Sequence, residues 1–274
     1  GSQELDIISI VDSITNYAAL IESPERIKYH LEKAFFYATR KGRPGPVWLD
    51  IPLDFQWAEI NPSTLKGYNK YKEQKKTKAY KNNINRFKKM IIKAERPLIL
   101  LGQGVRLAYA EKDFKKVLEK WSIPFISTWG ASDIIPTNHC LYVGRPGVAG
   151  QRGANLAMQN CDLLIAIGSH LSVALTGTLF HYFARDAKRV IVNIDQNELN
   201  NETVKVDLAI KSDAKEFLKD ISSLNLNSTP KIDYWKKKCV IYNSYNKVLP
   251  KDIKSSELVS PYTFLDRLNK KTSK

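Results

Sequence analysis

Cysteine and histidine are scarce in this chain of 274 residues. Its three cysteines, Cys140, Cys161 and Cys239, are scattered, and no two of them stand in a CxxC spacing. An odd number of widely spaced cysteines supports neither a disulfide framework nor a zinc site. The four histidines show no metal-ligand spacing near carboxylates. The sequence therefore predicts no metal site within this chain.

Long apolar runs and a signal peptide are also missing. No stretch approaches the roughly 20 consecutive apolar residues that a membrane-spanning helix needs. The first residues, GSQELDII, have neither the basic start nor the apolar stretch of a secretory signal. These absences predict a cytoplasmic protein without a membrane partner.

Acidic residues are few compared with basic ones. The chain has 28 Asp and Glu against 43 Lys and Arg, a net charge of +15. Such an excess is typical of proteins that bind nucleic acids or anionic surfaces. Much of it lies in two Lys/Asn-rich stretches, 66–93 and 231–274, which flank the most apolar part of the chain and lack a recognition-helix or RNP-like pattern. We interpret these stretches as basic linkers and expect no nucleic-acid partner; the alternative predicts salt-dependent retention of DNA.

Hydrophobic residues make up 43% of the chain, enough for one large or two ordinary domains. Near the N-terminus, residues 23–41 carry apolar side chains at helical spacing. This pattern ends at Gly42, where prolines begin the stretch GRPGPVWLDIPLD, and residues 47–51 of that stretch form a short apolar run. A helix that leads through a proline turn into a buried strand is typical of the last αβ step of an α/β domain.

From about residue 84, apolar strands alternate with helices. Strands without apolar–polar alternation, separated by helices, indicate a parallel sheet covered on both faces. The predicted fold class is α/β: a doubly wound, mostly parallel Rossmann-like sheet, preceded by the last αβ element of a second α/β domain. We predict strands at 97–101, 123–127, 163–167, 190–194 and 208–210, and helices at 108–121, 151–160 and 213–221.

Ligands of such a sheet bind beyond the carboxyl ends of its strands, so the loops there are candidate sites. Glycines in these loops let a backbone approach a phosphate, although a tight turn without any ligand explains each of them equally well. Gly102 and Gly104 do not complete a GxGxxG fingerprint, because position 107 is Leu. Four glycines within residues 144–153 favour ligand contact there, and His170 is a candidate because it follows a strand end.

Four segments resemble one family. GRPGPVWLDIPLDFQ, RPLILLGQGV, GVAGQRGANLAMQNCDLLIAIGSHLSVALTG and VIVNIDQNEL occur in this order. In order and separation they are similar to segments of thiamine-diphosphate-dependent enzymes of the acetolactate synthase type, over nearly the whole chain. The resemblance implies that residues 1–60 are the C-terminal part of a pyrimidine-binding domain and 61–83 a basic linker. It further implies that 84–225 are the central Rossmann-like domain and 226–274 a connector to an absent pyrophosphate-binding domain.

The family's activating glutamate would lie upstream of Gly1, and its GDG motif for diphosphate and magnesium downstream of Lys274. The resemblance therefore implies an internal fragment that holds no catalytic residue and is inactive alone. The full-length protein would use thiamine diphosphate and Mg²⁺, act on a 2-oxo acid, and form a homodimer or homotetramer. FAD is the cofactor implied for the central domain, where the corresponding binding residues are Gly102, Gly104, Thr128, Gly147, Gly150, Gly168, Ser169, His170, Asp195 and Asp213.

The sequence departs from the family pattern in two places. Ala174 stands where acetolactate synthases have an arginine of the substrate channel, and Thr15-Asn16 stands where they have Thr-Lys. A methyl group cannot form the charge-assisted pair that a carboxylate favours. These departures weigh against acetolactate synthesis from two pyruvates. The alternative function is that of a nucleotide-binding or scaffold Rossmann-like module without catalysis.

Overall fold

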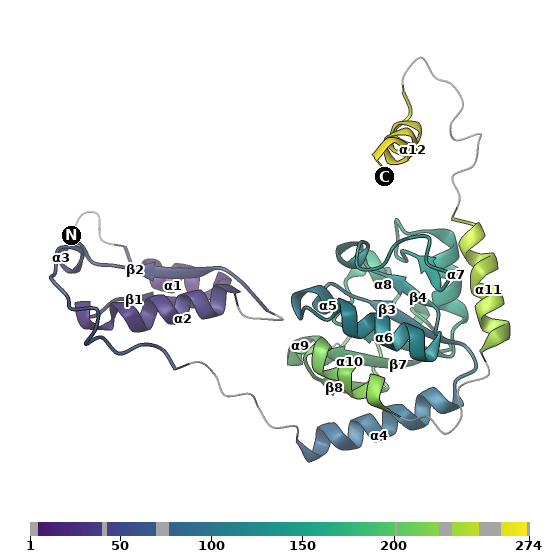
Figure 1. The fold of residues 1–274 in the computed structure, drawn as a ribbon, viewed down its shortest axis with the longest axis horizontal. Coiled ribbons are helices and arrows are strands. Elements are labelled where there is room, and N and C mark those ends of the chain that lie inside the picture. Colours follow the sequence, from purple (N-terminus) through teal and green to yellow (C-terminus); the bar gives the residue numbers. More distant parts are fainter. Residues whose placement is uncertain are drawn as a thin grey trace.

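A computed structural model describes residues 5–39, 43–69, 77–200, 202–224, 232–246 and 259–272. The N-terminal elements form a small unit of their own (Figure 1). In it β1 (Tyr17–Leu20) and β2 (Val47–Asp50) pair in parallel, and α2 (Ile27–Thr39) packs against them. The predicted passage from a helix through prolines into a strand is thus confirmed. Two shorter helices complete the unit, α1 (Ile7–Val11) and α3 (Leu53–Gln56).

The central unit is built on a parallel sheet of six strands in the order β5-β4-β3-β6-β7-β8. Its two middle strands, β3 and β6, are distant in sequence but lie side by side, with Pro97 opposite Leu163. From β3 the chain winds outward to β4 and β5, and from β6 it winds the other way to β7 and β8. This reversal confirms the doubly wound, Rossmann-like class. The strands are β3 (Pro97–Leu101), β4 (Phe125–Ser127), β5 (Tyr142–Gly144), β6 (Leu163–Ile167), β7 (Lys188–Asn193) and β8 (Leu208–Lys211).

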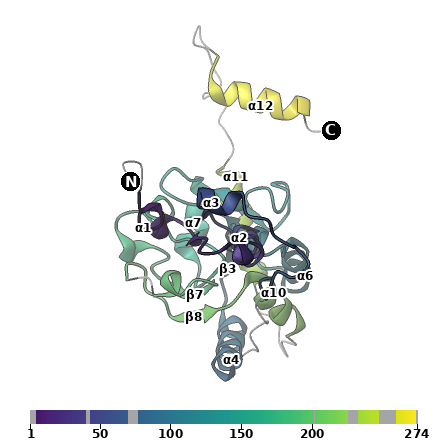
Figure 2. The same cartoon turned by 90° about the vertical axis from the view of Figure 1, so that its left-hand side faces the viewer.

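Helices cover both faces of this sheet because right-handed crossovers in opposite directions place them on opposite sides. On one side α6 packs against α10, and on the other α7 packs against α11; α4 lies against β8 at the sheet edge (Figures 1 and 2). The helices of this unit are α4 (Lys78–Lys93), α5 (Gly104–Leu107), α6 (Glu111–Trp121), α7 (Arg152–Asn160), α8 (Val173–Thr176), α9 (Gln196–Leu199), α10 (Ala214–Ser223) and α11 (Asp233–Ser244). A separate helix, α12 (Pro261–Thr272), buries none of its side chains.

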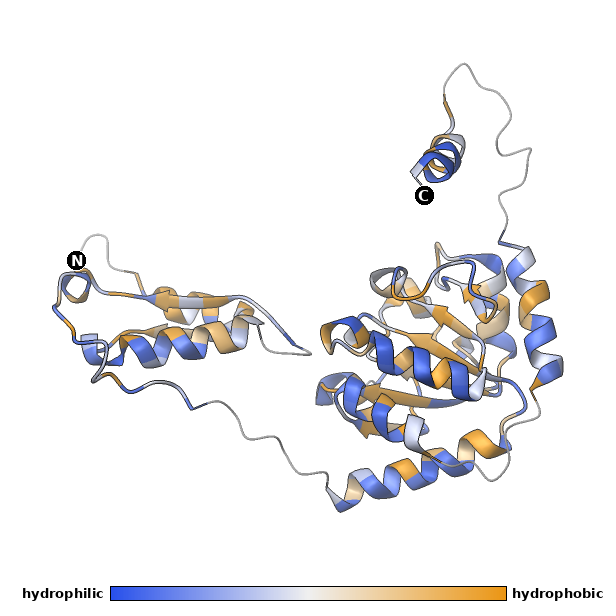
Figure 3. Cartoon of the chain, viewed as in Figure 1, coloured by the Kyte–Doolittle hydropathy of each residue, from blue (hydrophilic) through white to orange (hydrophobic). Residues whose placement is uncertain are grey.

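The core lies between the sheet and these helices. Every residue of β3 and of β6 is buried, as expected for strands covered on both faces. Figure 3 shows largely apolar strands inside this unit and helices that carry both apolar and polar residues. Phe87 of α4 contacts the rings of both Trp121 and Phe217, which joins three helices through one aromatic cluster.

Two elements extend the central unit beyond the ranges that the sequence assigned to it. Helix α4 begins at Lys78, inside the predicted linker 61–83, and it buries Tyr80 in the core. Helix α11 lies inside the predicted connector 226–274, yet Trp235 and Cys239 are part of the same core. Both helices must therefore be counted with the central unit when its stability is considered.

Among the residues that the structure describes, no helix has both the length and the apolar character that crossing a membrane requires.

Candidate functional site

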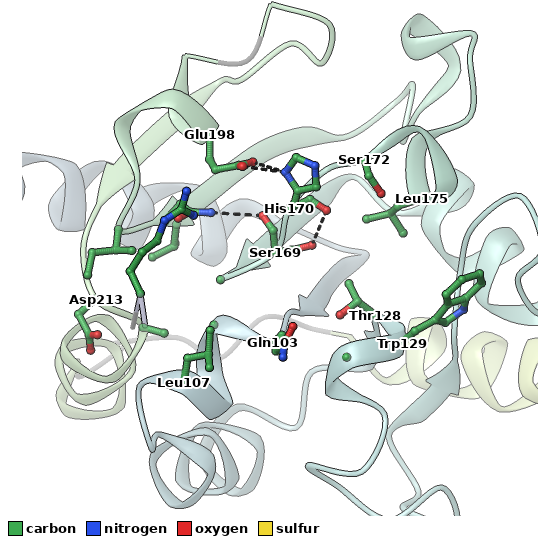
Figure 4. Close-up of a pocket in the computed structure, with 18 of the residues that line it drawn as sticks. Gln103, Leu107, Thr128, Trp129, Ser169, His170, Ser172, Leu175, Glu198 and Asp213 are labelled. Atoms are coloured by element: carbon green, nitrogen blue, oxygen red, sulfur yellow. Dashed lines mark hydrogen bonds and ion pairs between the residues drawn. The ribbon is translucent and has the colours of Figure 1, made fainter. Parts of the chain in front are cut away.

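A cavity of about 360 Å³ opens at the carboxyl ends of the central strands (Figure 4). Loops that follow β3, β4, β6, β7 and β8 all contribute to its lining. It lies where the winding direction of the sheet reverses, between β3 and β6, which is the usual ligand position in open α/β sheets. Its volume falls toward the lower end of the roughly 300–1,000 Å³ found for small-molecule pockets.

Three predicted glycines lie at the floor of this cavity, where the loops after β3 and β6 cross. The Gly104 N–H donates to the Gly168 carbonyl over 2.9 Å, and the Gly102 N–H donates to Ile167 over 2.9 Å. A Cβ atom on Gly102 or Gly104 would collide with the backbone of Gly168. These glycines therefore permit the close contact of two loops. Gly104 and Gly168 line the cavity, whereas Gly102 lies beneath it.

Small polar residues form one part of the wall. Ser169 is buried, and its carbonyl accepts a bond of 3.3 Å from the Asn193 side-chain amide. Thr128 lines the cavity from the loop after β4, and its own N–H is bonded to the Leu101 carbonyl at the end of β3. The neighbouring Trp129 is 59% exposed at the cavity mouth. Figure 4 shows Thr128 and Ser169 on different elements that meet at the cavity.

His170 is hydrogen-bonded to Glu198 at the cavity wall. Its Nδ1 atom lies 2.7 and 2.8 Å from the two carboxylate oxygens of Glu198 (Figure 4). The Glu198 side chain is only 16% exposed, whereas that of His170 is 71% exposed. Glu198 was not among the predicted site residues, although its place on α9, directly after the carboxyl end of β7, is a signal that could have identified it.

Asp195 pairs with a residue from the N-terminal unit. Its Oδ2 atom lies 2.6 Å from Nη2 of Arg43, while its Oδ1 atom accepts the Asn197 N–H at the start of α9. Arg43 lines the cavity, whereas Asp195 supports it from the edge. Arg43 was not among the predicted site residues. Nothing in the sequence GRPGPV indicates that its arginine contacts a loop of the central unit.

Asp213 lies at the N-terminus of α10. Its Oδ1 atom accepts the Lys215 N–H over 2.8 Å and the Glu216 N–H over 3.4 Å, an ordinary capping arrangement. The residue also lines the cavity, next to Ser212. Its carboxylate charge is therefore partly balanced by the helix terminus.

The glycine-rich loop 144–153 contributes less to the cavity than the sequence predicted. The Gly147 N–H and carbonyl are both bonded to the Asn155 side chain, each over 2.9 Å, which fixes this loop to α7. Pro146 is the residue of this loop that lines the main cavity. Gly147 does not line it, and Gly150 borders a separate hollow beside Trp129.

The lining as a whole suits binding more than covalent chemistry. Carboxylates and hydroxyls of the lining can accept or donate hydrogen bonds, and the apolar side chains between them can contact a flat ring. In the described part of the chain, no group of three or more His, Cys, Asp or Glu side chains is placed to hold a metal ion. The apolar part consists of Leu107, Trp129, Pro146, Ala174, Leu175, Val192 and Ile194.

Comparison with known proteins identifies relatives of this chain. Residues 84–221 match the family described as thiamine pyrophosphate enzyme, central domain. The probable acetolactate synthase large subunit of Methanocaldococcus jannaschii is 36% identical over 227 residues, which cover 80% of this chain and 37% of the relative. The acetolactate synthase large subunit of Corynebacterium glutamicum is 35% identical over 221 residues, covering 79% and 34%. The chain thus spans little more than a third of the length of these curated relatives.

Proposed function

The chain belongs to the thiamine pyrophosphate enzymes through its central domain, and from this we propose that it supplies that domain to an acetolactate-synthase-like carboligase or decarboxylase. The family match over residues 84–221 carries the proposal. The doubly wound sheet and the cavity at its switch point support it. The relatives named acetolactate synthase large subunits give the subtype.

We propose that the complete activity belongs to a longer protein that contains this chain. Thiamine diphosphate supplies the carbanion chemistry with which such enzymes break and form bonds beside a carbonyl carbon. Segments outside this chain would bind that cofactor and its Mg²⁺, and the substrate would be a 2-oxo acid. We further propose that the longer protein is cytoplasmic and forms a homodimer or homotetramer.

The test is an assay of that longer protein with thiamine diphosphate and Mg²⁺. We expect release of CO₂ from pyruvate or a related 2-oxo acid, and we expect none when thiamine diphosphate is omitted. The present chain alone should release none. If the longer protein with both cofactors leaves every such acid intact, the alternative of a non-catalytic nucleotide-binding or scaffold module is the better assignment.

For the cavity we propose a ligand that contains a nucleoside, because carboxylates, hydroxyls and apolar side chains share its lining at the switch point of a Rossmann-like sheet. The resemblance implies FAD here, and the fit is partial. The acidic and hydroxyl groups suit ribose, and the apolar wall suits a ring. The diphosphate finds no such match, because Arg43, the one lysine or arginine of the described lining, is already paired with Asp195. A visible absorbance spectrum of the purified protein, before and after addition of FAD, tests for bound flavin.

A further inference from the structure

The charged groups around the cavity are matched with one another. Arg43 is held by Asp195 at 2.6 Å, and His170 is held by Glu198 at 2.7 Å. Asp213 faces the positive end of α10. Among the described lining residues Arg43 is the only lysine or arginine, and it comes from the N-terminal unit.

A phosphate group entering this cavity would meet unfavourable charges. Three carboxylates lie in or beside the cavity, those of Asp195, Glu198 and Asp213, whereas Arg43 is the one arginine among the described lining residues. A diphosphate would have to compete with Asp195 for Arg43, and it would stand near the carboxylates of Glu198 and Asp213. Like charges a few ångströms apart in a partly buried site repel strongly. The local charge is thus opposite in sign to the net charge of +15 of the whole chain.

An uncharged ligand with hydroxyl groups meets no such conflict. Its hydroxyls can donate to the carboxylates of Glu198 and Asp213 and to the hydroxyls of Thr128 and Ser212, residues that all border the cavity. A planar ring can lie against apolar side chains of the lining such as Trp129. Hydrogen bonds from neutral hydroxyls to carboxylates are favourable because one partner is charged.

We propose that this cavity binds an uncharged nucleoside and discriminates against nucleotides that carry a diphosphate. The proposal refines the nucleoside-containing ligand given above, and it does not depend on the thiamine chemistry of the longer protein. Discrimination would come from the carboxylates, from the pairing of Arg43 with Asp195, and from the neutral side chain of Ala174. That residue lines the cavity, is exposed on α8, and offers no positive charge.

The test compares adenosine, ADP and FAD by isothermal titration calorimetry with the full 274-residue chain. We expect adenosine to bind about tenfold or more tightly than either ADP or FAD, the order of effect that uncompensated charge produces. Ala174→Arg places a cation at the cavity wall, and it should raise the affinity for ADP about tenfold. Ser244→Arg on α11 adds the same charge at a position outside the lining, and it should change neither affinity.

Two results would overturn the proposal: ADP or FAD binding as tightly as adenosine, or no binding of adenosine at all. An unchanged ADP affinity in Ala174→Arg, with unfolding like that of the parent chain, would also count against it. The carbon dioxide assay of the longer protein is read separately. If the longer protein releases no CO₂ but the chain still prefers adenosine to ADP and FAD, only the thiamine assignment is rejected. If CO₂ is released but adenosine is not preferred, only the nucleoside site is rejected.

Discussion

Gly102 illustrates, at the scale of a single residue, why a glycine in a loop has two explanations. The sequence places it after a strand, where a backbone can approach a phosphate. In the structure the loop after β6 occupies that space. A Cβ atom on residue 102 would therefore collide with the Gly168 backbone. A sequence pattern shows that room is needed near a backbone, but it does not show whether a ligand or another loop fills it. The place of Gly104 and Gly168 on the cavity lining was, by contrast, predictable from the strand ends.

Gly102→Ala should therefore destabilise the central unit. Neither loop can move without disturbing β3 or β6, so we expect a loss of roughly 2–3 kcal/mol in the free energy of unfolding. Urea denaturation followed by circular dichroism measures it. Gly130→Ala is the matched control, because the atoms nearest to its Cβ belong to the flexible side chain of Gln103; a change within about 0.5 kcal/mol is expected there. Equal effects of the two substitutions would contradict this explanation.

His30 in the N-terminal unit predicts a pH dependence. Its Nδ1 atom lies 2.6 Å from the Tyr17 hydroxyl, whereas its Nε2 atom is buried without a partner in the described structure. Burial lowers the pKa of His30, and the positive charges of Arg26 and Lys33 lower it further, against a smaller opposing effect of Glu22. A histidine whose pKa falls on folding contributes stability above its unfolded pKa and loses that stability as the pH falls through the folded value.

We therefore expect the N-terminal unit to unfold more easily at about pH 5.5 than at about pH 7.5, on either side of the unfolded histidine pKa near 6.5. His30→Gln retains an acceptor for Tyr17 but does not titrate, and it should reduce this difference. His181→Gln, at an exposed position, should leave it unchanged. Thermal unfolding followed by near-ultraviolet circular dichroism measures the effect, and equal pH dependence in all three proteins would rule out His30 as its source.

At the scale of elements, buried strands were the most predictable. The predicted strands 97–101 and 163–167 are β3 and β6 with the same bounds. An unbroken apolar run of this length between turn residues is typical of a buried strand. Strand β5 (Tyr142–Gly144) was not predicted, because three residues are too few to produce a period. Helix α4 was interpreted as linker because lysine and asparagine dominate its composition. Its buried side chains nevertheless recur at helical spacing, as Tyr80, Ile84, Phe87 and Ile91. Packing of this apolar face against the core stabilises the helix despite its polar composition.

Helix α11 should contribute strongly to the stability of the central unit. Trp235 is 2% exposed, and its Nε1–H donates to the Pro97 carbonyl over 2.9 Å at the start of β3. Trp235→Ala should cost about 3–5 kcal/mol through the cavity that it leaves. Trp235→Phe removes the hydrogen-bond donor but keeps an aromatic ring. It should lower the free energy of unfolding by about 1–2 kcal/mol more than a substitution at an exposed position does. Urea titrations measure both losses.

Tyr234→Ala on the same helix is the control for this experiment. Its side chain is 70% exposed, so a change within about 0.5 kcal/mol is expected. If Trp235→Ala behaved like this control, α11 would not be part of the cooperative core.

At the scale of the whole molecule, the sequence predicted the class of the sheet and the edge at which the cavity lies, because both follow from the order of strands and helices. It did not predict that Arg43 reaches Asp195, a contact between residues of different units. Pairings of this kind depend on the three-dimensional placement of loops, which no local period records. The same holds for His170 and Glu198, which are brought together by the alignment of β6 with β7.

The two units should differ greatly in stability. In residues 5–39 and 43–69 the buried apolar residues are Val11, Ile21 and Ala34, while Phe35 and Trp57 are 68% and 83% exposed. A two-stranded sheet with so small a core is marginally stable in water. Hydrogen exchange followed by mass spectrometry should therefore show the amides of β2 exchanging far faster than those of β3 and β6, which open only when the central unit unfolds globally. Low urea should accelerate exchange in β2 before it affects β6, and equal protection of these strands would mean that the two units unfold together as one.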